Sequence, residues 1–361
     1  MKKILFISNI ISPYRIQFFN ALKDICNLKV LYVAENEKNR SWDTNMNEIN
    51  YDFDVLNGTS FSIGSARTIH LNFGWKKIIK SYNPSLVVLG TDLLSTIISP
   101  LVLLYCKKND IKIVRFEGTH SSIVKPHQEF FYKFLFKHFD GFFVYSVLTK
   151  KYLKQKYKIR NELIEVGYNV GDSSFFINND LKKVDENVVK FIFIGNLNEN
   201  KNTLNILKIF KNHFDRKNIK IEIAGDGPLI NEIKNFGKNF KNLNLEILGF
   251  IQKNELFKRI KNSDILMHVS KSDRASIAVS EALLCGLFVI GSEFDGSAHN
   301  FINKKKNGII VNPYETDDIK NAISWTLNNI NKINKEEIVR SMKHFNVESY
   351  AYRLINSKII N

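Results

Sequence analysis

The chain has 361 residues, of which 44% are hydrophobic and 24% are charged. At roughly 150 residues per domain, this length predicts two domains with a core each, and the composition excludes a disordered or fibrous chain. The formal net charge is +16, but the excess is mostly lysine scattered among asparagines, so we expect no nucleic-acid binding. The three cysteines lie far apart, which argues against a zinc site or disulfides and favours a cytoplasmic protein.

Two apolar runs have the hydrophobicity of membrane segments, but each is better explained by a strand. The first, at 4–11, is short, has no small-residue cleavage site and runs into Pro13, so we expect a first strand rather than a signal peptide. The second, at 86–106, is divided by Gly90, Asp92 and Pro100, which favours a buried strand followed by a helix. We therefore predict a soluble protein that binds at most to the surface of a membrane.

Short β-branched runs alternate with amphipathic helical stretches along the whole chain, which is the pattern of βαβ units. The pattern occurs twice, on either side of a polar stretch, so we predict an α/β protein with two doubly wound parallel sheets. The domains are expected at 1–170 and 187–345, joined by a linker at 171–186, with a last helix at 346–361 that returns to the N-terminal domain. The expected strands are 3–8, 28–33, 86–89, 112–116, 142–145 and 163–166 in the first half, and 189–194, 219–224, 243–248, 265–269, 288–290 and 308–311 in the second.

Ligands of such sheets bind beyond the carboxyl ends of the strands, so the loops there form the candidate site. The strand that ends at Gly195 is followed by Asn196 and, just before a helix, by Lys201. A lysine beside the free N–H groups of a helix start is suited to a phosphate, although a single lysine is more often a solvated surface residue. The next strand ends in Gly225-Asp226-Gly227-Pro228, a turn that lacks the GxGxxG spacing and is weak evidence of a phosphate loop by itself.

The loop after the strand at 265–269 brings several polar groups together. Asp273 and Arg274 lie in the loop, and Ser276 and Ile277 begin a helix whose first N–H groups are expected to be free. Such N–H groups suit a diphosphate, and the Glu281 carboxylate on the helix is suited to accept both hydroxyls of a ribose. Gly286 then ends the helix before the next strand.

These segments resemble, in this order, the motifs of the retaining glycosyltransferases of family 4, which have the GT-B fold of two facing Rossmann-like domains. The matching segments of the second half are Gly195-Asn196-Leu197 with Lys201, Gly225-Asp226-Gly227-Pro228, Leu248-Gly249-Phe250, Asp273 to Glu281, and Glu281-Ala282 with Gly286. Near the N-terminus, Ser12-Pro13-Tyr14-Arg15 and Phe18-Phe19 resemble a branch of the family that builds bacterial surface polysaccharides. The resemblance covers nearly the whole chain.

The resemblance implies transfer of a sugar from a nucleotide-diphosphate sugar to a glycan or lipid-linked acceptor, with retention and without a metal or other cofactor. It implies that Lys201 stabilises the departing phosphate, that Asp273 binds hydroxyls of the donor sugar, and that His120 contacts the donor. The N-terminal domain would hold the acceptor near Arg15 and Glu117, and the C-terminal domain would hold the donor. The donor-binding residues would be Gly195, Asn196, Lys201, Gly225, Asp226, Gly227, Arg274, Ser276, Ile277 and Glu281.

Five positions depart from the pattern of the family. The chain has Asn196 in place of an arginine, Asp273 in place of a glutamate, Ala275-Ser276 in place of Phe-Gly, and Phe288 in place of a proline. The missing cation at position 196 leaves less positive charge for the diphosphate, which Arg274 would replace. These departures keep open a non-catalytic protein of the same fold that serves as a partner subunit in glycan assembly.

Three other patterns bear on the function. A nicotinamide-dependent oxidoreductase is disfavoured because the first turn, Ser8 to Ser12, has no glycine for close approach of a pyrophosphate. Asp52-Phe53-Asp54 has the DxD form of metal-binding glycosyltransferases of the other fold, but so short a pattern is frequent by chance and a strand explains it. The stretch from Lys125 to Arg160 is rich in lysine, which predicts contact with anionic lipid, although its phenylalanines also suit burial against a sheet.

Overall fold

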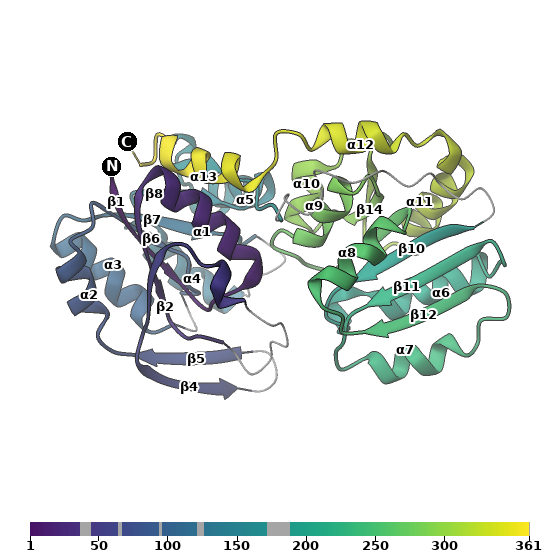
Figure 1. Ribbon diagram of the computed structural model, residues 1–361, viewed down its shortest axis with the longest axis horizontal. Coiled ribbons are helices and arrows are strands. Elements are labelled where there is room, and N and C mark those ends of the chain that lie inside the picture. The colour runs from purple at the N-terminus through teal and green to yellow at the C-terminus, as the bar shows by residue number, and fades with distance from the viewer. Residues whose placement is uncertain (37–44, 64–66, 94–95, 121–125, 172–187, 361) are drawn as a thin grey trace. The chain divides into compact units, whose positions relative to one another are not determined.

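The computed structural model describes residues 1–36, 45–63, 67–93, 96–120, 126–171 and 188–360. The chain forms two compact units, one made of Met1–Tyr168 with Val347–Asn361 and the other of Asn169–Asn346 (Figure 1). Of the linker expected at 171–186, all but Gly171 lies outside the described residues, and Gly171 belongs to the second unit.

The first unit contains a seven-stranded parallel sheet in the order β3-β2-β1-β6-β7-β8-β9. The order of the strands reverses between β1 and β6, so the loops after these two strands lie at the switch point of the sheet. A separate antiparallel pair, β4 with β5, was not expected, because its short polar residues give little apolar alternation. The strands are β1(Lys3–Ser8), β2(Asn27–Tyr32), β3(Asp52–Val55), β4(Gly58–Ile63), β5(Arg67–Asn72), β6(Leu86–Leu89), β7(Lys112–Glu117), β8(Gly141–Val144) and β9(Ile164–Val166).

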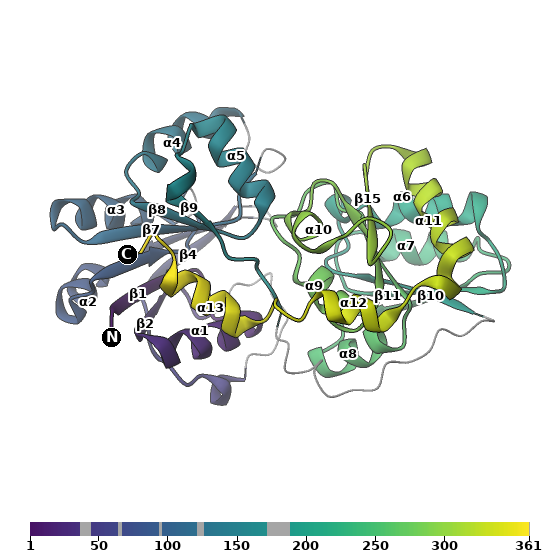
Figure 2. The same ribbon diagram turned by 90° about the horizontal axis from the view of Figure 1, so that it is seen from above.

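Helices cover both faces of this sheet. Four helices, α2(Trp75–Tyr82), α3(Ile98–Lys108), α4(Pro126–Phe136) and α5(Val147–Tyr157), share one apolar cluster with alternate strand residues such as Leu5 and Val87. Since side chains alternate along a strand, Phe6, Phe116 and Phe143 point to the opposite face. There they meet α1(Pro13–Ile25) and α13(Val347–Asn356), which lie side by side in Figures 1 and 2. Short 3-10 helices lie at Met46–Glu48 and Asn161–Leu163.

Tyr350 packs the last helix, α13, against the first unit. Its side chain is 1% exposed, and its ring centroid lies 4.5 Å from that of Phe18 on α1 and 5.5 Å from that of Phe143 on β8. Aromatic pairs at these separations contribute about 0.5–1.5 kcal/mol beyond the burial of their surface. The last helix therefore completes the core of a domain that begins some 340 residues earlier in the chain.

The second unit contains a six-stranded parallel sheet in the order β12-β11-β10-β13-β14-β15, with its switch point between β10 and β13. Gly286 adopts a φ of 78° directly after α9, and this left-handed conformation ends the helix as the sequence predicts. The strands are β10(Val189–Ile194), β11(Ile219–Ala224), β12(Asn244–Gly249), β13(Ile265–His268), β14(Phe288–Ser292) and β15(Gly308–Val311). The helices are α6(Thr203–His213), α7(Ile230–Gly237), α8(Lys253–Lys261), α9(Ile277–Leu284), α10(Gly296–Phe301), α11(Thr316–Asn329) and α12(Lys335–Ser341), with 3-10 turns η4(Glu199–Lys201) and η5(Ile330–Lys332).

The apolar run at 86–106 forms β6 and α3, as predicted, with α3 only 11 residues long. Within the described ranges, none of the helices combines the length and the apolar character needed to cross a bilayer.

Replacing Tyr350 by alanine is expected to lower the free energy of unfolding by about 3–5 kcal/mol, because removal of a fully buried ring leaves a cavity. Urea denaturation followed by circular dichroism measures this loss. Tyr352→Ala is the matched control, since the Tyr352 side chain lies on the same helix and is 62% exposed. An equal loss in both variants would contradict the role assigned to Tyr350.

Candidate functional site

The loops after β10 and β13 are tied together at the carboxyl ends of these neighbouring strands. The backbone N–H of Lys271 donates to the carbonyl of Asn200 over 2.8 Å, and the Asn200 side-chain amide donates to the carbonyl of Ser272 over 2.7 Å. Asn198 caps the turn η4 by accepting from the backbone N–H of Lys201. These bonds bring Lys201 and Asp273, which are 72 residues apart in the sequence, to the same point.

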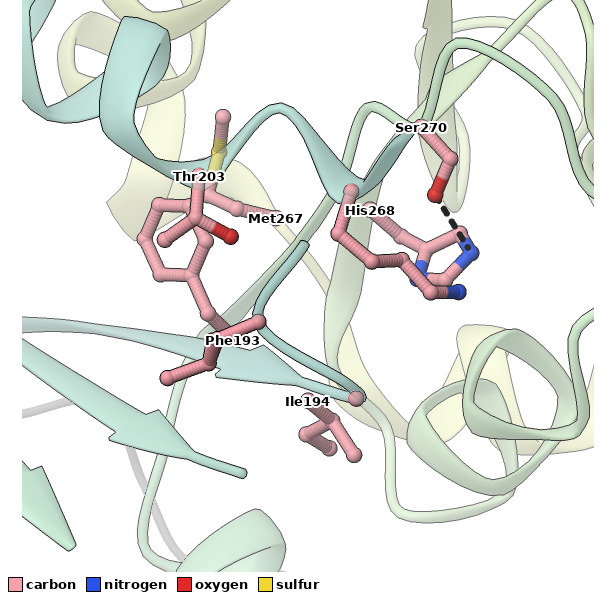
Figure 3. Close-up of a pocket in the computed structure, with 9 residues that line it drawn as sticks. Phe193, Ile194, Thr203, Met267, His268 and Ser270 are labelled. Atoms are coloured by element: carbon pink, nitrogen blue, oxygen red, sulfur yellow. Dashed lines mark hydrogen bonds between the residues drawn. The ribbon is translucent and has the colours of Figure 1, made fainter. Parts of the chain in front are cut away.

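Lys201 and Asp273 form the central ion pair of the site. Lys201 Nζ lies 2.7 Å from Asp273 Oδ2, and the two side chains are 21% and 20% exposed. Burial opposes ionisation of Asp273, but the charge on Lys201 outweighs it and holds the pKa of the carboxyl well below its usual range. Lys201 also lines a pocket with Gly195, Thr203, His268 and others, part of which Figure 3 shows. Lys201 thus lies at the edge of a pocket with Asp273 as its partner, and both side chains are partly exposed to solvent.

Two buried side chains, His268 and Asp295, lie close to Asp273. His268 Nε2 lies 3.4 Å from Asp273 Oδ2 and 3.6 Å from Asp295 Oδ2, and it contacts Ser270 Oγ at 3.4 Å (Figure 3). Neither His268 nor Asp295 was expected at this site. The sequence feature that could have indicated His268 is its position at the end of β13, next to the switch point. Asp295 belongs to no recognisable motif.

The start of α9 differs from the expectation in one respect. The N–H of Ser276 is not free for a diphosphate, because it donates to Asp295 Oδ1 over 3.1 Å. Ile277 is the first residue of the helix, and Glu281 is half-buried one turn further on. Gly171 packs closely against Glu281. A Cβ at position 171 would lie 2.7 Å from Glu281 Cγ, so a larger residue there would displace the Glu281 side chain.

Gly195, Asn196, Gly225, Asp226 and Gly227 form two loops in mutual contact. The Gly195 N–H donates to the carbonyl of Ala224, and the Leu197 N–H donates to that of Asp226. A Cβ on Gly225 would lie 1.9 Å from the carbonyl oxygen of Gly195, so only glycine allows this approach. Asn196 and Asp226 are exposed, and Asp226 Oδ1 accepts from the Gly227 N–H at 2.7 Å. Arg274 is exposed beside Asp273.

Glu117 has a structural role that differs from the acceptor contact expected of it. Its Oε1 accepts hydrogen bonds from the N–H groups of Gly118 and Thr119, each at 2.8 Å, and from the Thr119 hydroxyl. Its Oε2 pairs with the Arg115 guanidinium at 2.9 Å, and both side chains are buried. His120 follows on the same loop and is 1% exposed, so it is a buried side chain rather than an accessible loop histidine.

Arg15 is also buried, and no carboxylate pairs with it in the described part of the chain. Its guanidinium lies 4.7 Å from the ring centroid of Phe116 and 5.1 Å from that of Tyr145, and it reaches the Tyr350 hydroxyl at 3.5 Å. Aromatic rings attract the charge through their faces but do not neutralise it. This cation stands at the start of α1, immediately beyond the carboxyl end of β1.

Asp52 and Asp54 face a lysine on the neighbouring strand. Lys29 Nζ lies 2.9 Å from Asp52 Oδ2 and 3.0 Å from Asp54 Oδ2, so the DxD pattern is explained by a cross-strand ion pair. Over the residues that the structure describes, no three His, Cys, Asp or Glu side chains are grouped so as to hold a metal ion.

Residues 176–340, most of the second unit, match the family model described as Glycosyl transferases group 1. A protein of Methanocaldococcus jannaschii described as an uncharacterized glycosyltransferase is 28% identical over 241 residues, or 60% of this chain and 57% of that protein. A second protein of that organism, described in the same words, is 24% identical over 189 residues, 50% of this chain and 48% of its own. The chain spans about half the length of the curated relatives it matches.

Solved structures resemble the chain over its whole length. HepE of Anabaena, in complex with UDP and glucose, has a TM-score of 0.69 at 15% identity and covers 98% of both chains. The lipopolysaccharide outer core galactosyltransferase WaaB has a TM-score of 0.72 at 17% identity, with 98% of both chains covered. A glycosyltransferase of Rickettsia africae has a TM-score of 0.75 at 15% identity and covers 99% of this chain and 98% of its own. The chain has the GT-B fold, with two Rossmann-like units.

Proposed function

We propose that the protein is a retaining, metal-independent glycosyltransferase of family 4 that moves a sugar from a nucleotide-diphosphate sugar to a glycan or lipid-linked acceptor. The observation that carries the proposal is the Lys201–Asp273 ion pair at the switch point of a unit that matches group 1 glycosyltransferases. The structural neighbours support a nucleotide-sugar donor, since HepE was solved in complex with UDP and glucose. The WaaB likeness supports a role in bacterial surface polysaccharide synthesis.

The chemistry of such a transfer suits this pair of charges. The bond between the anomeric carbon and the diphosphate oxygen breaks, and negative charge builds up on the leaving diphosphate. Retention requires the acceptor oxygen to bond to the anomeric carbon on the face that the diphosphate leaves, and its proton passes to the leaving group. Lys201 would supply positive charge to the diphosphate, and the Asp273 carboxylate would accept hydrogen bonds from hydroxyls of the sugar. Donor binding would thus exchange the partner of each side chain.

The donor nucleotide would lie along the glycine loops and α9. The diphosphate would lie beside the glycine backbone, and Ile277 and Arg274 would contact it in place of the Ser276 N–H, which is bound to Asp295. The half-buried Glu281 would accept the ribose hydroxyls. The contact between His120 and the donor stays a prediction. The His120 side chain is buried in the ligand-free protein.

The acceptor would bind to the first unit near Arg15. A buried guanidinium surrounded by aromatic rings favours an acceptor that carries a negative group, such as a phosphate. Glu117 would act only by shaping the loop, because its oxygens are already bound.

A non-catalytic partner subunit is the alternative, and Asn196 is the observation that favours it. The side chain is exposed and neutral, so one cation of the family pattern is missing at the candidate diphosphate position. Incubation with a panel of nucleotide sugars separates the two functions, since an enzyme releases nucleoside diphosphate slowly even without an acceptor.

Lys201→Ala and Glu281→Ala are each expected to abolish most of the transfer while the fold stays intact. Loss of one charge-assisted hydrogen bond to the donor costs about 1.5–3 kcal/mol, or roughly 10- to 150-fold in kcat/KM. Initial rates over a range of donor concentrations measure the loss in kcat/KM, and thermal unfolding shows whether the fold is intact. Lys208→Ala, on the outward part of α6, is the control. Activity near that of the wild type in either site variant would refute the assignment.

Transfer is expected to persist in excess EDTA, because Lys201 rather than a metal ion would neutralise the diphosphate. The measurement compares initial rates with EDTA, with Mg²⁺ and with Mn²⁺ at one ionic strength. Loss of activity in EDTA and its recovery with either metal would overturn the metal-independent mechanism and return attention to Asp52 and Asp54.

We also propose that one helical face of the first unit binds anionic membrane. On α4 the aromatic residues are divided, since Phe136 is buried but Phe130 and Phe134 are 82% and 51% exposed. On α3, which covers the same face of the sheet, Leu101 and Leu104 are 46% and 59% exposed. On α5, Lys150, Lys151 and Lys154 line a surface pocket with Val147 and Gln155. Lysine near an anionic surface contributes about 1 kcal/mol each, and the exposed rings would enter the interface.

The triple change of Lys150, Lys151 and Lys154 to Glu is expected to abolish sedimentation with anionic vesicles at low salt, and Phe130→Ser with Phe134→Ser to weaken it. Changing Lys304, Lys305 and Lys306 to Glu in the second unit gives the same change of net charge on exposed residues and is the control. Equal binding by the α5 variant and this control, or no preference for anionic over neutral lipid, would favour an acceptor that is not bound to a membrane.

A further inference from the structure

Asp295 is a carboxyl group that is 0% exposed, in the loop between β14 and α10. Its Oδ1 accepts two backbone hydrogen bonds, from the Ser276 N–H at 3.1 Å and from the Ser297 N–H at 2.9 Å. Its Oδ2 is buried and has no hydrogen-bond partner among the described residues. A buried carboxylate oxygen that accepts no hydrogen bond raises the free energy of the folded protein. The same oxygen is suited to carry the hydrogen of a neutral carboxylic acid.

The groups around Asp295 decide which carboxyl keeps a negative charge. The loops of Asp273 and Asp295 run beside each other, because the Asp273 N–H donates to the carbonyl of Phe294 and its carbonyl accepts from the Gly296 N–H. Two neighbouring carboxyls do not both ionise at low cost. Lys201 is bound to Asp273, so Asp273 takes the charge. Burial, and then the charge on Asp273, raise the pKa of Asp295 well above its usual range, while the two backbone N–H groups and Lys201 act in the opposite direction.

His268 is the remaining group that faces Asp295. The ring is 3% exposed, and burial, together with the charge on Lys201, lowers its pKa, which favours the neutral form of the ring. Its Nε2 lies between Asp273 Oδ2 and Asp295 Oδ2, at 3.4 and 3.6 Å. A lone pair on Nε2 gives the unpartnered Asp295 oxygen an acceptor for its proton.

We propose that Asp295 is a positioning residue of the donor site: as a neutral acid it donates from Oδ2 to His268 Nε2, and it leaves one carboxylate charge, on Asp273, facing Lys201. This inference rests on the proposed function, in which Lys201 leaves Asp273 for the diphosphate of the donor. Two ionised carboxyls would hold the ammonium more strongly, and the diphosphate would have to compete with both. The same acid fixes the tautomer of His268, with the hydrogen on Nδ1, and joins the start of α9 to the start of α10.

The variants Asp295→Asn and Asp295→Ala separate this role from mere packing. The amide of asparagine is neutral, keeps an acceptor for the two backbone N–H groups and offers a donor toward His268, whereas alanine removes all three. Asp295→Ala is expected to lower kcat/KM more than tenfold, and Asp295→Asn to recover most of that loss. Because ionisation of Asp295 adds a second charge beside Lys201, activity of the wild-type protein should fall on the alkaline side. In Asp295→Asn this fall should begin at higher pH.

Stability follows the same logic. A carboxyl whose pKa is raised on folding makes the protein less stable as the pH rises from the pKa of the unfolded chain to that of the folded one. Asparagine does not ionise, so Asp295→Asn should unfold at the same temperature as the wild type or higher at neutral pH, and Asp295→Ala at a lower one. If Asp295→Asn is as inactive as Asp295→Ala, or if its pH profile superimposes on that of the wild type, the proposal is overturned.

A measurement on the ligand-free full-length protein keeps the inference independent of transfer activity. In ¹⁵N-labelled protein the His268 signals, identified by their loss in His268→Gln, should show a neutral Nδ1–H tautomer from pH 6 to 8. An Nε2–H tautomer or a charged ring would refute the neutral acid even if the protein is an active transferase. If the tautomer is as expected but no nucleotide sugar is turned over and UDP does not bind, the proposed function fails and the assignment of the proton stands.

Discussion

The candidate site depends on one interaction, the ion pair between Lys201 and Asp273. Neither residue is fixed by its own secondary structure, since Lys201 ends a 3-10 turn and Asp273 lies in a loop. They meet because parallel strands deliver their loops to one edge, and β10 and β13 are neighbours only because the order of the sheet reverses between them. In the ligand-free protein the two charges neutralise each other. In the proposed transfer, the diphosphate of the donor would replace Asp273 as the partner of Lys201.

Strands could be predicted well from the sequence and isolated polar contacts could not. The strands at 3–8, 86–89, 189–194, 219–224 and 308–311 have the bounds expected of them, because buried parallel strands are continuous runs of β-branched residues between turn residues. The β4–β5 pair was missed, since Gly-Thr-Ser-Phe-Ser-Ile has no strong apolar periodicity. Motif order brought Lys201, Asp273 and Glu281 into one hypothesis, and the structure supplies the 2.7 Å contact that the hypothesis lacked.

The side chains that were misjudged share a physical cause, namely that burial is a property of tertiary packing. Glu117 ends a strand and precedes a polar loop, and local sequence predicts an exposed environment for such a residue. Arg115, two residues earlier on the same strand, provides the positive charge that allows Glu117 to be buried. Ser276 shows the same limit for a backbone group, because its N–H is taken by Asp295, 19 residues later in the chain. Distances of this kind have no signature in a single sequence.

The path of the chain through its two units also constrains how the protein is made. The first unit is interrupted in sequence by the second, and the aromatic layer around Phe18 and Phe143 is closed by Tyr350 near the end of the chain. During synthesis the second unit is complete on the ribosome before α13 has been translated, whereas the first must wait with part of its apolar layer uncovered. Nascent chains of this protein therefore expose phenylalanine to solvent for the time needed to synthesise some 180 residues, and in that interval they are natural clients for chaperones.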